Sequence, residues 1–195
     1  NEVTMPLLIA GEIFEKSGRR HAFGNDMFSL QDRYERDYIL GPTHEELFVM
    51  AAKEKIKSYR DMPFNLYQIG NKYRDEARPR YGLIRTREFT MKDAYSFDID
   101  EAHTDIAYAK MAKAYNNIFD RMDIDYRVVK ADTGAMGGLL SEEYQAVSEI
   151  GEDVLVLCDK CNFSSNIEIA EVKGQAFEKE EAKNMELVHT PGAHT

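Results

Sequence analysis

The chain has 195 residues, enough for one compact domain or for one domain and part of another. It has 25 lysines and arginines against 35 acidic residues, which gives a net charge of −10. This charge excludes a dedicated nucleic-acid-binding surface, so we expect no DNA partner and expect any RNA to be held mostly by other parts of the protein. No stretch approaches the roughly 20 apolar residues that span a bilayer and no signal-peptide pattern opens the chain, so we expect a cytoplasmic protein without a membrane partner.

The first 40 residues predict three strands and little helix. Alternating apolar residues over 2–9 predict a strand near an edge or interface, because Pro6 lies inside it. This strand begins abruptly, as if upstream sequence were missing. Residues 11–25 mix glycine, serine and charged side chains, which predicts a loop-rich passage around one short helix. Two further strands are expected at residues 27–30 and 38–40.

A helix is predicted from Thr43 to about Tyr59. Glu46 follows Thr43 by three residues, which is the pattern of a capping box, and apolar residues then recur at helical spacing. By this interpretation the Thr43 hydroxyl caps the helix, and that structural role alone would explain the residue.

The middle of the chain predicts a long hairpin followed by a helix. Extended runs at 64–74 and 83–97 flank a polar loop, which favours two antiparallel strands. Asp100 then precedes an apolar stripe of about four helical turns that ends at Met122, and this helix is expected to pack on the sheet. Four short strands follow, interrupted by a flexible segment from Gly134 to Gly138; they are expected at 126–130, 143–147, 154–157 and 166–169.

These elements predict an α+β domain over residues 1–171, with a mixed but mainly antiparallel sheet and flanking helices. The apolar content falls after Glu171, so residues 172–195 are expected to form a linker or the start of another domain.

The second long strand carries unusual chemistry on one face. Because side chains alternate along a strand, one face should hold Arg85, Arg87, Phe89, Met91, Asp93 and Tyr95. Cations, an aromatic ring, a carboxylate and a phenol together suit a cavity that binds a phosphorylated, ring-bearing ligand. The hairpin could bring Arg74 and Glu76 beside this set. A solvated hairpin with weak surface ion pairs is the alternative that the pattern leaves open.

The strings Lys72–Glu76 and Arg85–Phe89 resemble the two halves of motif 2 of the class II aminoacyl-tRNA synthetases. The resemblance implies that Arg74 contacts the ATP α-phosphate and the amino-acid carboxylate, and that Glu76 binds the adenine amino group. It places Arg85 on the phosphate side and stacks Phe89 on the adenine. Arg74 and Arg85 are then the expected catalytic residues, since a guanidinium can bind two oxygens and follow the charge that develops.

The string Gly41–Glu46 resembles the Thr-x-Glu loop of the prolyl-tRNA synthetases. In that family the Thr and Glu receive the proline ring nitrogen, whose two N–H donors match one hydroxyl and one carboxylate. The resemblance therefore implies proline binding by Thr43, Glu45, Arg74 and Asp93. Val3–Pro6 resembles the end of motif 1, which lines the dimer interface of class II enzymes, so a homodimer is implied.

The likeness to bacterial prolyl enzymes extends over about residues 1–171. It includes Glu88–Phe97, Ala131–Gly134, Gly137–Gly138 and Ser141–Glu143. One departure is Glu142, which adds a negative charge where many relatives have histidine. Tyr95 stands where the threonyl enzymes carry a zinc-binding histidine, and a phenol is a poor replacement for an imidazole on zinc.

We expect no metal-binding residues in the chain. Cys158 and Cys161 are the only cysteines; they form half of a zinc site without a second pair, so free thiols in a reducing compartment are the favoured interpretation. The five histidines are scattered, and each is expected at the surface or at a helix cap. His44 lies within a motif, but its side chain should point away from Thr43 and Glu45.

The resemblance implies a proline–tRNA ligase, in which ATP and proline form prolyl-adenylate, magnesium neutralises the phosphates, and the prolyl group moves to tRNA(Pro). This chain lacks motif 3 and the anticodon-binding domain of the family, so by itself it is expected to be inactive. Residues after Glu171 fall where bacterial enzymes insert an editing domain. The alternative is a synthetase-like binding or regulatory protein without catalysis, which the motif 2 residues argue against.

Overall fold

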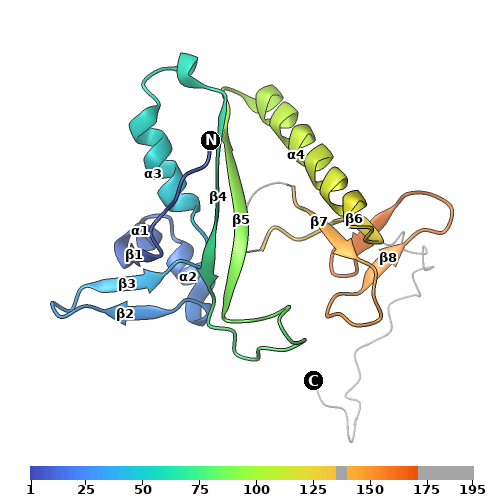
Figure 1. Cartoon of the computed structure of the whole chain (residues 1–195), viewed down its shortest axis with the longest axis horizontal. Coiled ribbons are helices and arrows are strands. Elements are labelled where there is room, and N and C mark those ends of the chain that lie inside the picture. The colour runs from blue at the N-terminus through green and yellow to red at the C-terminus, as the bar shows by residue number, and fades with distance from the viewer. Residues whose placement is uncertain (135–139, 171–195) are drawn as a thin grey trace, which may run out of the picture.

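The computed structural model describes residues 1–134 and 140–170, and Figure 1 shows their arrangement. Three features named in the sequence analysis lie outside the described residues. They are Gly137–Gly138, most of the predicted flexible segment and the predicted linker at 172–195. The described part contains helices and mainly antiparallel strands, which agrees with the predicted α+β class. No helix in it has the length and apolar character needed to cross a membrane.

The N-terminal part forms a three-stranded antiparallel sheet in the order β1-β3-β2. Its elements are β1 (Leu8–Ala10), α1 (Gly11–Lys16), α2 (Arg19–Phe23), η1 (Gly24–Asp26), β2 (Ser29–Gln31) and β3 (Asp37–Leu40). The core beneath it consists of buried apolar side chains from several elements: Ile9, Phe14, Met27, Ile39 and Leu47.

Two predictions for this part were wrong in detail. The strand expected at 2–9 is confined to β1, and the residues before it lie beside the hairpin, where the Val3 amide donates to the Tyr67 carbonyl at 2.9 Å. Two helices replace the single predicted one, because Gly18 adopts a φ of 75° and interrupts the helical path between them.

The helix predicted from Thr43 is α3 (Glu45–Lys55), followed by the single turn η2 (Tyr59–Asp61). The predicted capping box at its start is wrong: the N-cap residue is His44, no side chain caps it, and the Thr43 hydroxyl donates to the Glu45 carboxylate instead. A capping box does occur at η2, between Ser58 and Asp61.

The predicted hairpin is confirmed as β4 (Phe64–Tyr73) and β5 (Glu88–Phe97), paired antiparallel over their whole length. β5 begins five residues later than the predicted run at 83, so Arg85 and Arg87 lie in the connecting segment and not on the strand. The predicted helix is α4 (Glu101–Arg121), capped by the Asp100 carboxylate. In Figure 1 the hairpin stands between α3 on one side and α4 on the other.

The third sheet has the order β7-β6-β9-β8 and contains one parallel pair, β6 with β9. Its strands lie within two residues of the predicted starts, and they are β6 (Tyr126–Lys130), β7 (Glu142–Ala146), β8 (Leu155–Leu157) and β9 (Ser164–Asn166). Rings of Tyr115, Phe119, Tyr126 and Tyr144 join it to α4. The hydrogen bonding of the described residues thus divides the expected single sheet into three.

Candidate functional site

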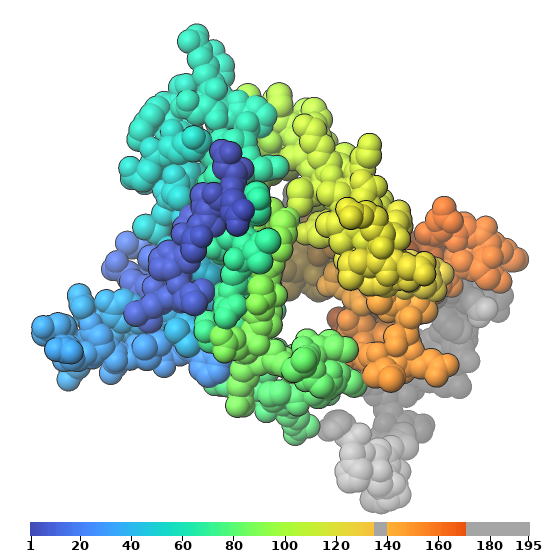
Figure 2. Space-filling model, viewed as in Figure 1, coloured from blue at the N-terminus to red at the C-terminus, as the bar shows by residue number. Residues whose placement is uncertain are grey.

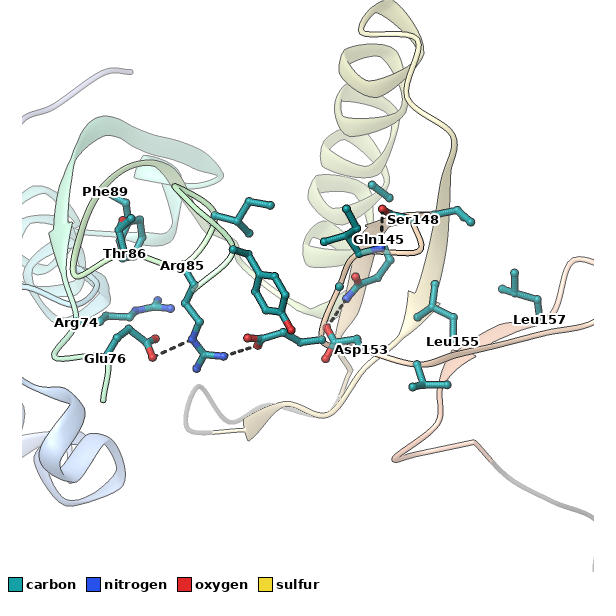
Figure 3. A pocket seen from close by; sticks show the side chains of 18 residues that line it. Arg74, Glu76, Arg85, Thr86, Phe89, Gln145, Ser148, Asp153, Leu155 and Leu157 are labelled. Carbon is teal, nitrogen blue, oxygen red and sulfur yellow. Dashed lines mark hydrogen bonds and ion pairs between the residues drawn. The ribbon is translucent and has the colours of Figure 1, made fainter. Parts of the chain in front are cut away.

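A cleft of about 760 Å³ lies between the loop end of the β4–β5 hairpin and the segment from β7 to β8. Figure 2 shows the molecule hollowed between these two parts, and Figure 3 shows the side chains that line the cleft. All four predicted ATP-binding residues line it: Arg74, Glu76, Arg85 and Phe89. The structure therefore brings together residues from both halves of the hairpin, as the spacing of the motif predicted.

Arg74 is held against the ring of Phe89, with its Cζ atom 5.4 Å from the ring centroid. The Arg74 amide donates to the Arg87 carbonyl at 2.9 Å, which fixes the backbone at the end of β4. Burial lowers the pKa of Arg74, while the carboxylates of Glu76 and Glu45 raise it. Within residues 1–134 and 140–170 its buried Nε atom has no hydrogen-bond partner. A partly buried cation with an open donor is suited to an anionic ligand.

Arg85 is shared between two carboxylates (Figure 3). Its Nε atom donates to Glu76 Oε2 at 2.9 Å, and its Nη1 atom donates to Glu152, which also pairs with Arg80. The hydrogen bond and charge of Glu76 raise the pKa of Arg85. Glu152 was not predicted as a site residue, because it lies 67 residues from Arg85 in an acidic loop without a motif. A phosphate bound by Arg85 would compete with Glu152.

Thr43 and Glu45 form a second group at the start of α3. Thr43 is buried, and its hydroxyl donates to Glu45 Oε2. The Glu45 side chain is 34% exposed, so a ligand can reach it. Glu45 does not line the 760 Å³ cleft; it faces a hollow beside α1 and α3. The charge of Glu45 raises the pKa of Arg74, against the larger effect of burial, which lowers it.

Asp93 lies in a buried polar network. Oδ1 accepts from Lys72 Nζ at 2.8 Å, and Oδ2 accepts from Gln68 Nε2 at 3.2 Å and from the Tyr95 hydroxyl at 2.6 Å. Burial alone would raise the pKa of Asp93, but these three donors outweigh it and lower the pKa below its usual range. Both oxygens are thus already in use, which makes Asp93 better suited to holding Lys72 and Tyr95 than to binding a ligand alone.

Tyr95 connects this network to the Thr43 group. Its ring centroid lies 4.3 Å from that of Phe48 on α3. Burial raises the pKa of Tyr95 strongly, and the hydrogen bond to Asp93 and the charge of Glu45 add to the effect, so the phenol stays protonated as a donor. The alternation predicted along β5 holds from Phe89 to Asp93, where the inward residues are less exposed than their neighbours, whereas Ala94 and Tyr95 are both half-buried.

Lys72, Gln68 and Arg19 were missed as site residues. Lys72 lies two residues from Arg74 and so points to the same side of the strand, which was a signal that it could belong to the site. A lysine is rarely fully buried without a buried partner, so the burial of Lys72 was not expected. The pairing of Gln68 with Asp93 depends on the hairpin register. Arg19 lies in a loop-rich passage that gave no pattern to follow.

The remaining candidates lie apart from the site. His44 is the N-cap residue of α3, which agrees with its expected place at a helix cap, but its side chain is fully buried, with Nε2 3.1 Å from the Pro6 carbonyl, and burial lowers its pKa. Glu142 accepts from the Tyr108 hydroxyl at 2.7 Å, and burial with this bond raises the pKa of Tyr108 to about 12. Cys158 and Cys161 are exposed free thiols.

No group of three or more histidine, cysteine or acidic side chains among the described residues could hold a metal ion by itself. The carboxylates at the wall of the cleft, Glu152 and Asp153, are oxygen donors of the kind that Mg²⁺ prefers. This donor set fits an ion that arrives on a phosphate ligand and keeps most of its other ligands as water.

Comparison with known proteins gives matches over the whole chain. Residues 28–188 match the family described as tRNA synthetase class II core domain (G, H, P, S and T). Two relatives named proline–tRNA ligase, from Syntrophomonas wolfei and Caldicellulosiruptor bescii, are 49% and 51% identical over 100% of this chain. The chain spans 34% of the length of each of these curated relatives.

A solved structure has a similar fold. It is the RNA-binding domain of threonyl-tRNA synthetase from Cryptosporidium parvum Iowa II, with a TM-score of 0.57 and 22% identity. The likeness covers 67% of this chain and 32% of that chain.

Proposed function

The chain belongs to the family of class II tRNA synthetase core domains, and from this premise we propose that it supplies the proline- and ATP-binding part of a proline–tRNA ligase. Relatives with that name are 45–51% identical over its full length. The observation that carries the proposal is Arg74, which lies on the Phe89 ring in the cleft and whose buried Nε atom has no hydrogen-bond partner among the described residues.

In this proposal the cleft binds ATP. Phe89 stacks on the adenine, and Glu76 accepts from the adenine amino group. Arg85 and Arg74 bind the phosphates, with Arg74 at the α-phosphate. Glu76 contacts Arg85 through one carboxylate oxygen, Oε2, so the other remains for the adenine. The Glu152 carboxylate must leave Arg85 when phosphate enters, because both compete for the same guanidinium.

We assign proline to the neighbouring group of Thr43, Glu45, Arg74 and Asp93. The ring nitrogen carries two N–H donors, which the Thr43 oxygen and the Glu45 carboxylate can accept, and Glu45 balances its charge. Arg74 binds the proline carboxylate and thereby holds it next to the α-phosphate. Asp93 acts mainly by holding the Tyr95 hydroxyl and Lys72 at the floor of this site.

The proposed reaction has two steps. The proline carboxylate attacks the α-phosphorus, which gives prolyl-adenylate and pyrophosphate, and the prolyl group then moves to the terminal ribose of tRNA(Pro). The carboxylate is ionised at neutral pH, so this chain needs to orient the reactants and neutralise charge and does not need to supply a base. Mg²⁺ bound with ATP, near Glu152 and Asp153, would neutralise phosphate charge. We place the protein in the cytoplasm, where this tRNA is used.

Amino-acid-dependent pyrophosphate exchange tests the proposal. The full-length protein that contains this chain is assayed with ATP and each of the twenty amino acids in turn. Proline is expected to support the fastest exchange. Faster exchange with another amino acid, or none with any, would refute the proposed activity.

We predict that Glu45→Ala in the full-length protein weakens the use of proline far more than the use of ATP. The loss of a charged hydrogen-bond partner costs about 1.5 to 3 kcal/mol, and Glu45 contacts only proline in our assignment. The KM for each substrate in pyrophosphate exchange measures the effect. Glu54→Ala is the matched control, since Glu54 lies on the same helix, is exposed and should change neither KM. Equal effects of Glu45→Ala on both substrates would remove Glu45 from the proline site.

We also propose that the full-length protein is a homodimer. β1 is an edge strand of its sheet, and Leu7 and Leu8 are 37% and 49% exposed there. An edge strand with exposed leucines commonly pairs with or packs on another surface. Light scattering of the full-length protein should give the mass of a dimer, and Leu8→Lys should shift it toward the monomer. A wild-type protein that stays monomeric at micromolar concentration would contradict this.

A further inference from the structure

Arg19 on α2 joins two consecutive carboxylates at the start of α3. Its Nη1 atom lies 3.0 Å from Glu45 Oε2 and 3.2 Å from Glu46 Oε1. The Ser17 hydroxyl donates to Glu46 Oε1 at 2.8 Å, and the Arg19 guanidinium lies 5.3 Å from the Phe23 ring centroid. The Arg19 and Glu46 side chains are 14% and 8% exposed, so this contact is largely shielded from water.

The same oxygen of Glu45 receives both of its donors. Oε2 accepts from Arg19 and from the Thr43 hydroxyl. These two donors fix the orientation of the carboxylate. The Glu45 side chain is 34% exposed, so it presents a fixed acceptor to a ligand.

The positive charge of Arg19 is needed to hold the Glu45 carboxylate beside that of Glu46. Without it, Glu45 and Glu46 would be two adjacent carboxylates at a partly buried site, and their repulsion would favour rotation of Glu45 toward water. One guanidinium between them leaves a net charge of −1 for the three side chains. That value matches the single positive charge of an amino-acid ammonium group.

We propose that Arg19 is a positioning residue for proline, which acts by fixing the Glu45 carboxylate so that it receives the ring nitrogen. The inference rests on the proposed function, and Arg19 itself need not touch proline. Arg19 also lowers the pKa of Arg74 slightly through its charge. An effect through Arg74 would change the use of ATP, whereas an effect through Glu45 changes the use of proline.

The test uses pyrophosphate exchange by the full-length protein with Arg19→Gln, Arg19→Lys and the control Arg20→Gln. Residues that hold a ligating side chain in place typically change affinity about tenfold. Arg19→Gln is therefore expected to raise the KM for proline about tenfold and to leave the KM for ATP within about twofold. Arg19→Lys keeps the cation and should give a smaller rise.

Arg20 provides a matched control because it lies next to Arg19 on α2 and carries the same charge, but it pairs with Asp37 at 2.8 Å and not with Glu45. Arg20→Gln should leave both KM values unchanged. Thermal unfolding of each variant checks that it folds. If Arg19→Gln does not fold, the comparison of Arg19→Lys with wild type still tests the inference.

A double-mutant cycle separates the possible outcomes. If Arg19 acts through Glu45, Arg19→Gln should have no further effect on the KM for proline in a Glu45→Ala background. An effect that persists there, an equal rise in both KM values, or no rise at all would overturn the role of Arg19 while leaving Glu45 in place. If Glu45→Ala itself leaves the use of proline unchanged, the proposed proline site fails and the role of Arg19 fails with it.

Discussion

Arg74→Ala in the full-length protein is expected to slow proline-dependent pyrophosphate exchange about a hundred- to a thousandfold. Arg74 is the residue common to both proposed substrates, since it binds the proline carboxylate and the α-phosphate between which the new bond forms. Its guanidinium is preorganised against Phe89 and partly buried, where each charge interaction is stronger than in water. Single-turnover formation of prolyl-adenylate measures the effect on the chemical step.

Two further variants make this result interpretable. Arg74→Lys keeps the charge but loses the planar fork that binds two oxygens, so it should recover only a small part of the rate. Arg78→Ala removes an exposed arginine from the same hairpin and should leave the rate unchanged. A rate for Arg74→Ala within about threefold of wild type would show that Arg74 does not stabilise the transition state, since one such donor is worth far more.

Lys72→Met is expected to destabilise the domain by about 3 to 5 kcal/mol, because it leaves the Asp93 carboxylate buried without its cation. Lys72 is fully buried, and its Nζ atom lies 2.8 Å from Asp93 Oδ1. The free energy of unfolding in urea measures the loss. Lys53→Met is the control, since Lys53 lies on α3 and is exposed.

A second change and a pH series test the cause of this destabilisation. Asp93→Asn added to Lys72→Met removes the buried charge, so it should recover part of the lost stability. The pKa of Asp93 is lowered in the folded state, so the contribution of the pair is present above the ordinary aspartate pKa and lost as the pH falls through the lowered value. The difference between wild type and Lys72→Met should therefore shrink in acid. A difference independent of pH would mean that packing, and not charge, explains it.

The elements with clear periodicity were predictable from sequence. The apolar residues at helical spacing that end at Met122 predicted α4, and the two extended runs predicted the β4–β5 hairpin. Both predictions were possible because each pattern persists over many residues. The inward face from Phe89 to Asp93 followed from alternation alone. The motif spacing also placed Arg74 and Phe89 together, and the structure confirms it, since the Arg74 Cζ atom lies 5.4 Å from the Phe89 ring centroid.

Features that depend on register or on contacts between distant segments were not predictable. The hairpin loop is six residues longer than predicted, which moved Arg85 off the strand to where it meets Glu76 and Glu152. Thr43 fits a capping pattern, yet the helix begins one residue later than this pattern predicts, with His44 as its N-cap, and the Thr43 hydroxyl donates to the Glu45 carboxylate. Arg19 reaches Glu45 across 26 residues, and no local pattern reports such a contact.

The most direct test of the central claim is a crystal structure of the full-length protein with a non-hydrolysable prolyl-adenylate analogue. We predict that the secondary ammonium lies within hydrogen-bond distance of Thr43 and Glu45, that Arg74 contacts the acyl and phosphate-equivalent oxygens, and that the adenine stacks on Phe89. An analogue bound with its proline ring away from Glu45, or with its adenine outside the cleft between the hairpin and β7, would contradict the account.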